Sequence, residues 1–317
     1  MAILTLVLLL PCVSHAQTRT SSDKKVSVGI IYEALSATNG PIWLAEDLAL
    51  YDKYGLDVKV IHARGALPVQ ALVSGAVEVG AFSGSSTVAA NLAESDLVFI
   101  AAKPNFSVIS VWTRKNSALK SLAELRGKTI GVSRAGSATH AIARIALRGV
   151  GLADKDVKFL HHGGLPEIFA SLEQGLVEVA FASAPRPGFR ELIDLSILKI
   201  PFLQGAIEVQ RGFLQSRRQV VLSFLRAYLE SIKIAKERPE LAVATVAKRL
   251  RVTAEVTRTG YPPHARVWEE IPYVRTDSVQ AILDLFAADK TAAARLIDNS
   301  ALKELVDSGF VKELYQR

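Results

Sequence analysis

Short apolar runs alternate with helical patterns along the first two thirds of the chain. The runs are rich in Val and Ile, which is typical of strands buried on both faces of a sheet. The predicted strands are 26–31, 58–61, 77–82, 97–102, 108–113, 128–132, 157–160 and 177–182. The segments 198–202 and 206–209 are expected to return toward the part of the fold that the first strands form. The predicted helices between the strands are 41–49, 68–74, 88–94, 121–126, 138–149 and 166–174. This order predicts an α/β fold of parallel βαβ units, whose ligand crevice lies beyond the carboxyl ends of the strands.

The last third of the chain has a different pattern. From about Arg217 it is almost wholly helical, with helices predicted over 217–237, 239–250, 277–287 and 300–315. The stretch 259–275 contains three prolines and Trp268. Because proline lacks the backbone donor that a helix interior needs, this stretch is predicted to be irregular and to pack across a lobe.

One segment of the chain nearly repeats itself. Residues 71–83 read ALVSGAVEVGAFS and residues 171–183 read SLEQGLVEVAFAS, with six of thirteen positions identical. Two copies of one strand–loop–helix–strand unit predict two similar lobes with a cleft between them. The alternative is that a short helix, a glycine and a Val-rich strand recur by chance, because they form a common α/β pattern.

The N-terminus predicts export. Residues 2–10 form an apolar run that is too short to span a bilayer, which needs about 20 residues. Ser14 and Ala16 place small residues before a cleavage site, so residues 1–16 are expected to be a signal peptide and the protein to be periplasmic or extracytoplasmic. No Lys or Arg precedes the run, which leaves either an upstream start or a weak signal open. Cys12 is the sole cysteine, and after cleavage no thiol or disulfide would remain.

Charge and motifs exclude several functions. The net charge is +7, but Lys and Arg are scattered among acids without a basic stripe, which argues against nucleic-acid binding and leaves a mild attraction for anions. The sequence lacks the glycine-rich dinucleotide and P-loop motifs and the serine-hydrolase elbow, so no cofactor is expected. His161 and His162 are adjacent and point apart, without a carboxylate at metal spacing, so no metal is expected.

Three loops that follow predicted strands are rich in Ser, Gly, Thr and Asn, at 34–40, 83–87 and 133–139. Each leads into a helix, whose start offers unpaired N–H groups and a positive dipole end. Together they suit an anion or a small polar molecule. The alternative is that these residues are ordinary N-caps. Arg134 and Arg186 could clamp a carboxylate or sulfonate, or lie on the surface, whereas Glu78 and Glu178 are expected to share a structural role.

Four segments carry a family resemblance: 41–58 (PIWLAEDLALYDKYGLDV), 74–80 (SGAVEVG), 122–132 (LAELRGKTIGV) and 175–180 (GLVEVA). They resemble the extracytoplasmic solute-binding proteins of ABC importers for nitrate, sulfonates and taurine, the SsuA/THI5-like group. The departures are mild: Glu78 and Glu178 stand where the family often has Asp, and Ala49 where it often has Gly.

The resemblance implies a type II periplasmic-binding-protein fold with two doubly wound α/β lobes, a hinge and a helical C-terminal segment. The first lobe would comprise 26–108 plus 203–317 and the second lobe 109–202, with hinges near 104–112 and 198–206. The protein would be a monomer that holds a small molecule between its lobes and delivers it to an ABC permease in the membrane, without catalysis.

The resemblance also implies a set of ligand contacts. In the first lobe they are Ser36, Asn39, Ser83, Gly84, Ser85 and Ser86; in the second they are Ser133, Ser137, Thr139, His162 and Ser183. Nitrate, sulfonate, pyrimidine, aromatic carboxylate and small amide ligands remain open. Two other classes also remain. One is an enzyme on the same fold, either thiamine-pyrimidine-synthase-like, against which the missing cysteine-rich motif argues, or menaquinone-pathway-like. The other is a ligand-sensing domain for a separate partner.

Overall fold

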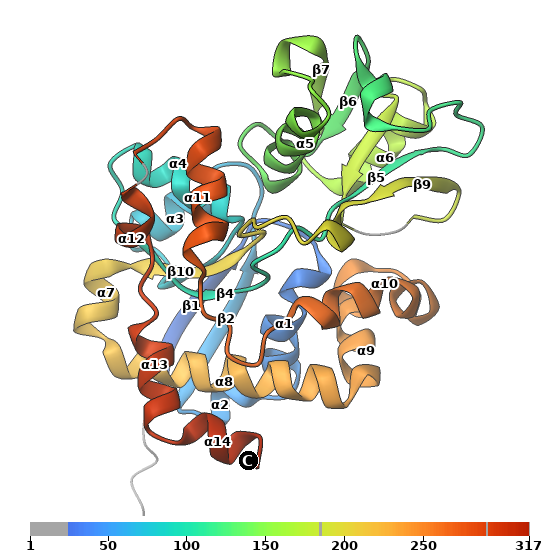
Figure 1. Ribbon diagram of the computed structural model, residues 1–317. Helices are drawn as coiled ribbons and strands as arrows, with labels where there is room; N and C mark the ends of the chain where they lie inside the picture. The colour runs from blue at the N-terminus through green and yellow to red at the C-terminus, as the bar shows by residue number, and fades with distance from the viewer. Residues whose placement is uncertain (1–24, 184–185, 290, 317) are drawn as a thin grey trace, which may run out of the picture.

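Two five-stranded sheets with helices packed around them form two lobes in the computed structural model (Figure 1). The structure describes residues 25–183, 186–289 and 291–316, so the predicted signal peptide lies outside the described residues. We call the lobe that carries the first strands lobe 1, and the lobe shown in green and yellow-green lobe 2.

The two sheets have the same strand order. In lobe 1 it is β2-β1-β3-β10-β4 and in lobe 2 it is β7-β6-β8-β5-β9. Four strands of each sheet are parallel, and the fourth in the order, β10 or β5, runs antiparallel to its neighbours. The lobe 1 strands are β1 Val26–Tyr32, β2 Leu56–His62, β3 Val79–Ala81, β4 Leu97–Ala102 and β10 Ala206–Gln210; those of lobe 2 are β5 Ser110–Arg114, β6 Thr129–Val132, β7 Lys158–His161, β8 Val179–Ala182 and β9 Phe189–Asp194.

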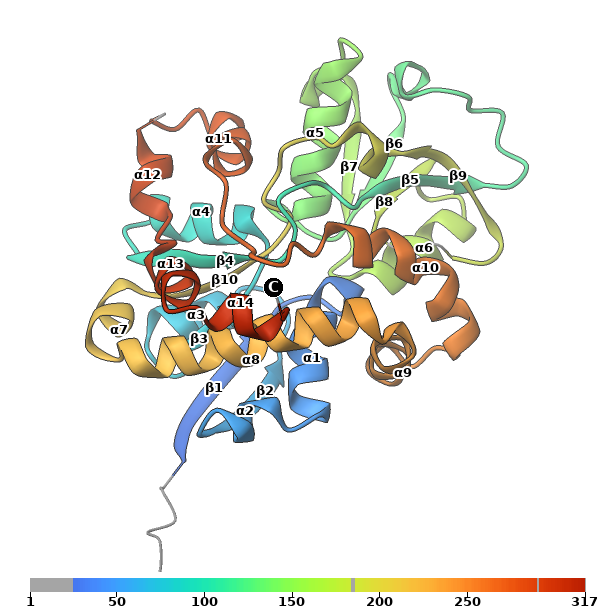
Figure 2. The same cartoon turned by 60° about the horizontal axis from the view of Figure 1, so that its bottom comes forward.

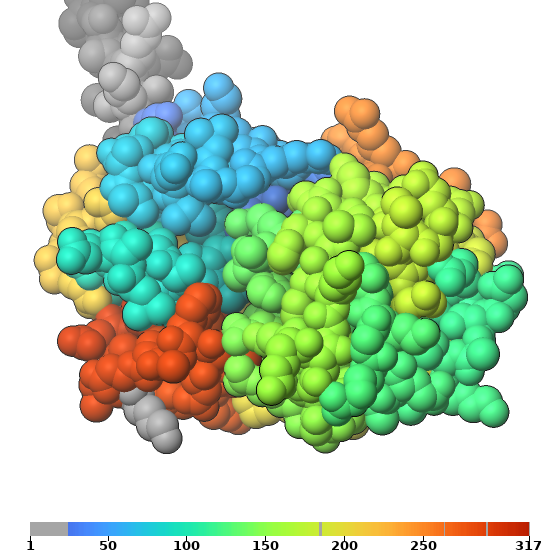
Figure 3. Space-filling view, turned by 90° about the horizontal axis from the view of Figure 1, so that it is seen from above, coloured from blue at the N-terminus to red at the C-terminus, as the bar shows by residue number. Residues whose placement is uncertain are grey.

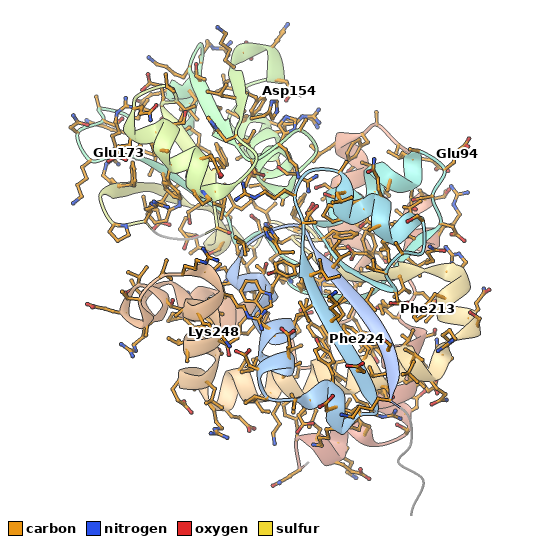
Figure 4. All side chains as sticks on the ribbon, turned by 180° about the vertical axis from the view of Figure 1, so that it is seen from behind. Glu94, Asp154, Glu173, Phe213, Phe224 and Lys248 are labelled. Atoms are coloured by element: carbon orange, nitrogen blue, oxygen red, sulfur yellow. The ribbon has the colours of Figure 1, made fainter. Side chains whose placement is uncertain are left out.

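Helices cover both sheets, and the C-terminal ones pack mostly on lobe 1 (Figures 1 and 2). The long α8 contacts α1, α9 and α13, and its Phe224 lies fully buried in the lobe 1 core (Figure 4). The helices are α1 Gly40–Asp47, α2 Leu50–Lys53, α3 Leu67–Val73, α4 Gly84–Leu92, α5 Ala138–Gly149, α6 Leu165–Glu173, α7 Arg211–Ser216, α8 Arg218–Glu237, α9 Pro239–Leu250, α10 Ala254–Val267, α11 Thr276–Leu285, α12 Ala292–Leu296, α13 Ser300–Asp307 and α14 Phe310–Leu314.

The sequence repeat corresponds to a structural repeat. Gly75 and Gly175 follow α3 and α6 with φ of 75° and 76°, the left-handed conformation that favours glycine after a helix. At the end of β10, Gln210 donates a hydrogen bond of 2.7 Å to a last-turn carbonyl of α3. At the end of β5, Arg114 donates one of 3.1 Å to the matching carbonyl of α6. The same unit is therefore built twice, with a different donor in each lobe.

The two repeated glutamates have structural partners, as expected. Glu78 accepts a hydrogen bond of 2.6 Å from the backbone N–H of Gly29 in β1. Glu178 pairs with Arg114 at 3.3 Å. Each carboxylate therefore joins the start of its strand to a neighbouring strand.

Two elements differ from the sequence prediction. The strand β9, which pairs with β5 at the edge of its sheet, was not predicted. Its sequence, FRELID, carries the charges typical of an edge strand rather than a continuous apolar run. The irregular segment predicted at 259–275 is also wrong over its first part, because α10 continues to Val267. Burial of Tyr261 and of Trp268 just after α10 compensates for the prolines.

The chain crosses between the sheets twice, and the two crossing segments lie side by side. Lys103 N–H donates to the Gly205 carbonyl at 2.8 Å, and Phe202 N–H donates to the Asn105 carbonyl at 3.0 Å. A β-bridge between Phe106 and Pro201 continues this pairing. The crossings therefore form one antiparallel band, which we call the crossing band.

Asn105 fixes the crossing band to the C-terminal segment. Its side chain is buried and donates to the Glu269 carboxylate and the Tyr273 carbonyl, each at 2.8 Å. Its Oδ1 accepts from the N–H of Arg275 and the hydroxyl of Ser278, each at 3.1 Å. All the hydrogen-bonding capacity of this amide is thus used inside the protein.

Replacing Asn105 with Ala is expected to destabilise the protein by about 3 kcal/mol, because buried donors and acceptors lose their partner. Asn116→Ala, at an exposed position, is the matched control and should change stability by less than about 0.5 kcal/mol. Urea unfolding followed by circular dichroism measures both. Equal stabilities of the two variants would contradict the role assigned to Asn105.

Candidate functional site between the lobes

The carboxyl ends of the parallel strands of both sheets face a chamber between the lobes. It has a volume of about 110 Å³. Glu33 follows β1, Lys103 follows β4, Ser133 and Arg134 follow β6, and Ser183 follows β8. Open parallel sheets place ligands at such strand ends. We call this space the polar chamber.

Glu33 organises the lobe 1 wall. Its carboxylate accepts a hydrogen bond of 2.7 Å from the N–H of Ser83 and one of 3.1 Å from the hydroxyl of Ser86. Both serines lie at the start of α4, where Ser83 is the N-cap. The helix start thus presents its positive end to a carboxylate of the protein itself.

Hydroxyl groups form most of the lobe 2 wall. Ser137 is the N-cap of α5 and accepts from the N–H of His140. Ser133 donates its N–H to the Thr139 hydroxyl at 2.9 Å, and its own hydroxyl donates to Ser137 at 2.9 Å. The loop is therefore held in shape by its side chains before any ligand binds.

Polar contacts join the two lobes across the chamber. The space-filling view shows the two lobes in contact with each other (Figure 3). Arg134 forms an ion pair with Glu33 and also donates to Ser86 at 3.2 Å. The hydroxyls of Ser36 and Ser183 lie 3.4 Å apart. At the rim, Arg64 and Glu167 form an exposed ion pair of 3.2 Å. The structure is thus a closed arrangement of the lobes.

A buried lysine lies at the floor of the polar chamber. Lys103 is 4% exposed, and its Nζ donates to the Asn39 side chain at 2.9 Å. Burial lowers its pKa, whereas the carboxylates of Glu208 and Glu33 act in the opposite direction. Burial likewise raises the pKa of Glu208, against the attraction of Lys103. Each charge therefore depends on the other to remain ionised in this low-dielectric position.

A second cavity adjoins the polar chamber, and the ring of His264 on α10 lines it. This side chain is 2% exposed, and Nε2 lies 3.1 Å from the carbonyl oxygen of Ser183 in lobe 2. Because a carbonyl oxygen can only accept, Nε2 carries the proton. Burial lowers the pKa of His264 to about 4, and the hydrogen bond to Ser183 opposes this shift.

The structure brings together six of the residues that the sequence analysis assigned to the site. Ser36, Ser83, Ser133, Ser137, Thr139 and Ser183 line the polar chamber. The other five are not lining residues of the chamber. Asn39 accepts a hydrogen bond from Lys103, and the Ser86 hydroxyl donates one to Glu33. Ser85 is fully buried, with its hydroxyl 3.1 Å from that of Ser83. Gly84 donates its N–H to the Leu203 carbonyl at 3.1 Å, and His162 donates its N–H to the Val132 carbonyl.

Charged lining residues are the main group absent from the ligand contacts that the sequence analysis predicted. They are Glu33, Arg64, Lys103 and Arg134, accompanied by His62, Gly163, Gly164 and Gln204. Arg134 had been considered as a clamp. Most of these residues directly follow a strand or lie in the crossing band, so a position just after a strand was the available signal.

Two further findings concern the described residues as a whole. Within the described part of the chain, no three His, Cys, Asp or Glu side chains are grouped as metal ligands. No helix among the described residues has the length and apolar character needed to cross a membrane.

The family model NMT1/THI5 like matches residues 37–242. No curated protein sequence is significantly similar to this chain.

Solved structures share the fold at low identity. The periplasmic aliphatic sulphonate binding protein SsuA from Escherichia coli is 20% identical, with a TM-score of 0.70 over 86% of this chain and 92% of that chain. The periplasmic nitrate-binding protein NrtA from Synechocystis PCC 6803 is 13% identical, with a TM-score of 0.76 over 90% and 89% of the two chains. A cysteine-to-serine mutant of DszB in complex with biphenyl-2-sulfinic acid is 14% identical, with a TM-score of 0.65 over 88% and 99%. Both binding proteins and an enzyme therefore use this periplasmic-binding fold.

His264 is expected to make stability depend on pH. Its pKa is about 4 in the folded protein and 6.5 ordinarily, so as pH falls from about 6.5 toward 4 the unfolded chain takes up a proton that the folded chain does not. Stability is therefore lost on acidification, by up to about 1.4 kcal/mol per pH unit. Between pH 7 and pH 4.5, urea unfolding should show a loss about 2 kcal/mol smaller in His264→Phe than in the unchanged protein.

The matched control is Leu198→Phe, which changes an exposed position without a titrating group. This variant should keep the pH dependence of the unchanged protein. If His264→Phe and Leu198→Phe lose the same stability on acidification, His264 does not remain neutral in the folded state.

Proposed function

This chain belongs to the NMT1/THI5-like family, and we propose that it is an extracytoplasmic solute-binding protein of an ABC importer. It captures a small polar or anionic molecule between its two lobes and delivers it to the membrane permease, without catalysis. The observation that carries this proposal is the polar chamber itself, whose walls come from the strand ends of both lobes.

The connection between the lobes supports capture by closure. The lobes are joined by the crossing band, and the polar contacts across the chamber are side-chain contacts that separate without unfolding either sheet. Rotation of two lobes about a narrow connection is a common way to enclose a ligand. An open form would expose Glu33 and Arg134 to solvent on opposite walls.

The chemistry of the polar chamber supports a small polar or anionic ligand. Lys103 and Arg134 contribute positive charge, and the helix starts at Ser83 and Ser137 contribute donors. An anionic group of the ligand would compete with Glu33 for Arg134, and its affinity depends on displacing that ion pair. The volume of about 110 Å³ is somewhat below that of the engineered cavity of about 150 Å³ that accommodates benzene. The closed chamber therefore suits a group of only a few non-hydrogen atoms.

A panel of nitrate, alkyl and aryl sulfonates, carboxylates, pyrimidines and small amides, tested by thermal shift, should reveal one class that raises the melting temperature, because ligand binding stabilises the native state. Arg134→Ala should then weaken binding of that class by at least about tenfold, since a charge-assisted hydrogen bond is lost. Arg148→Ala changes an exposed arginine of α5 and is the matched control, with unchanged affinity. Calorimetry measures both affinities.

Small-angle scattering and product analysis complete the test. A tight ligand should reduce the radius of gyration, because it favours the closed arrangement. Absence of compaction with a tight ligand would contradict capture by closure. Chemical conversion of the ligand would instead favour an enzyme, the alternative suggested by the DszB neighbour on the same fold.

A further inference from the structure

Ser183 of lobe 2 meets lobe 1 at two places. Its hydroxyl lies 3.4 Å from that of Ser36, in the loop after β1. Its carbonyl oxygen accepts a hydrogen bond of 3.1 Å from Nε2 of His264 on α10. Figures 1 and 2 show the setting, where α10 reaches from lobe 1 toward α6 of lobe 2. The contact of His264 therefore extends the junction between the lobes from the polar chamber to a C-terminal helix.

The hydrogen bond between His264 and Ser183 depends on the closed arrangement. Ser183 directly follows β8 of the lobe 2 sheet, whereas α10 packs against α9 and the short helix Ala37–Asn39 of lobe 1. Rotation of lobe 2 about the crossing band would carry the Ser183 carbonyl away from α10. Leu165 and Phe169 of lobe 2, which line the second cavity together with His264, would leave with it. An open form would therefore leave Nε2 of the ring to water.

The closed arrangement favours the neutral form of the His264 ring. Nδ1 has less than 1 Å² of accessible surface and no hydrogen-bond partner among the described residues. In an imidazolium, Nδ1 also carries a proton, so it would become a buried donor without an acceptor. The positive charge would lie on a side chain that is only 2% exposed. Both effects penalise protonation while the lobes are closed.

The charged groups around His264 do not offset this penalty. Among the described residues that line the second cavity, the one charged side chain is Arg186 of lobe 2, which contacts the Phe169 ring. The loop after β1, α6 and α9 contribute uncharged side chains to the cavity. On α10 itself, Arg266 is exposed, and burial raises the pKa of Tyr261, whose hydroxyl donates to the Ala235 carbonyl. None of these groups is a carboxylate that could pair with an imidazolium.

We propose that His264 is a positioning residue for closure, whose neutral ring holds lobe 2 through the Ser183 carbonyl and whose protonation favours the open form. The inference rests on the proposed function, because it needs lobes that open and close. It goes beyond that function by making closure depend on the proton concentration.

The direction of the pH effect follows from linkage. Burial lowers the pKa of His264 to about 4 in the closed arrangement, against 6.5 ordinarily. In an open form whose ring reaches water, the pKa returns toward 6.5, so closing the lobes below that pH expels a proton. Closure is therefore fully favoured above about pH 6.5 and is lost progressively as the pH falls toward 4.

A disulfide between the lobes measures closure without a known ligand. Because the hydroxyls of Ser36 and Ser183 lie 3.4 Å apart, Ser36→Cys and Ser183→Cys together bring two sulfur atoms within bonding reach when the lobes are closed. Ser183→Cys keeps the carbonyl that His264 contacts. Cys12 is the sole natural cysteine, and Cys12→Ser removes it so that no other thiol reacts. The full chain is equilibrated with reduced and oxidised glutathione, and mass spectrometry gives the oxidised fraction.

The equilibrium constant of this disulfide should fall about eightfold from pH 7 to pH 5.5, the change expected when the pKa of one group is 6.5 in the open form and about 4 in the closed form. Thiols of ordinary pKa, about 8.5, stay protonated at both pH values and contribute little. An unchanged constant would overturn the proposal. Failure of the disulfide to form at pH 7 would contradict the closed junction from which the proposal is drawn.

Two changes at His264 separate its proton from its packing. His264→Gln keeps an N–H donor for Ser183 but does not titrate, so the disulfide should form within about twofold of the unchanged background at pH 7 and lose the eightfold fall. His264→Phe lacks the donor and should form it about fivefold less readily at pH 7, the effect of one hydrogen bond, also without the fall. Arg266→Gln changes an exposed residue of the same helix and is the matched control, with the fall retained.

Any fall that remains in His264→Gln belongs to other groups, such as His62 in the lining of the polar chamber. An equal fall in the unchanged background, His264→Gln and His264→Phe would show that His264 has a structural role only, and the proposal would be wrong.

The inference and the proposed function fail in different ways. A solute that compacts the protein at pH 7, together with an equal fall in His264→Gln and the unchanged background, overturns the role of His264 alone. A fall that His264→Gln abolishes, with no solute producing compaction, supports the role of His264 and overturns capture by closure.

Discussion

The exchange of one strand between the two sheets is the constraint on which the rest of the structure depends. Along the chain, β5 follows β4 of lobe 1 but lies in the lobe 2 sheet. In the same way, β10 follows β9 of lobe 2 but lies in the lobe 1 sheet. The chain must therefore cross twice. Because both strands lie at the same position in their sheets, the crossings meet and pair, and the strand ends of the two lobes face one another across one space.

Charge within the polar chamber is balanced by the protein itself. Glu33 faces Arg134, and buried Lys103 is close enough to Glu208 for each to influence the pKa of the other. Under the proposed function, a ligand would enter a site whose charged groups already have partners, and it would have to offer each group a better partner than the one it replaces. Such competition lowers affinity but improves selectivity, because solutes that match only one of the charges gain little.

The sequence predicted the elements better than it predicted the site. The repeat at 71–83 and 171–183 indicated two like lobes because apolar periodicity and glycine placement are local signals. β9 was missed because an edge strand tolerates charge, and α10 was missed because the burial of Tyr261 and Trp268 outweighs its prolines. In the site, serines were predicted from hydroxyl-rich loops at helix starts and from the family resemblance, but Glu33 and Lys103 come close to the other site residues only when distant strand ends meet.

The crossing band has a mechanical consequence. Both covalent connections lie in one narrow strip, which is pinned to the C-terminal segment through Asn105. A strip of this kind permits rotation of lobe 2 about the long axis of the strip, and it resists sliding of lobe 2 along lobe 1. Displacement then grows in proportion to distance from that axis, so a few degrees of twist near Asn105 would carry the outer helix end at Glu173 (Figure 4) along a much longer arc. The geometry of the crossing band therefore sets how far lobe 2 moves for a given rotation, whichever molecule stabilises the closed arrangement.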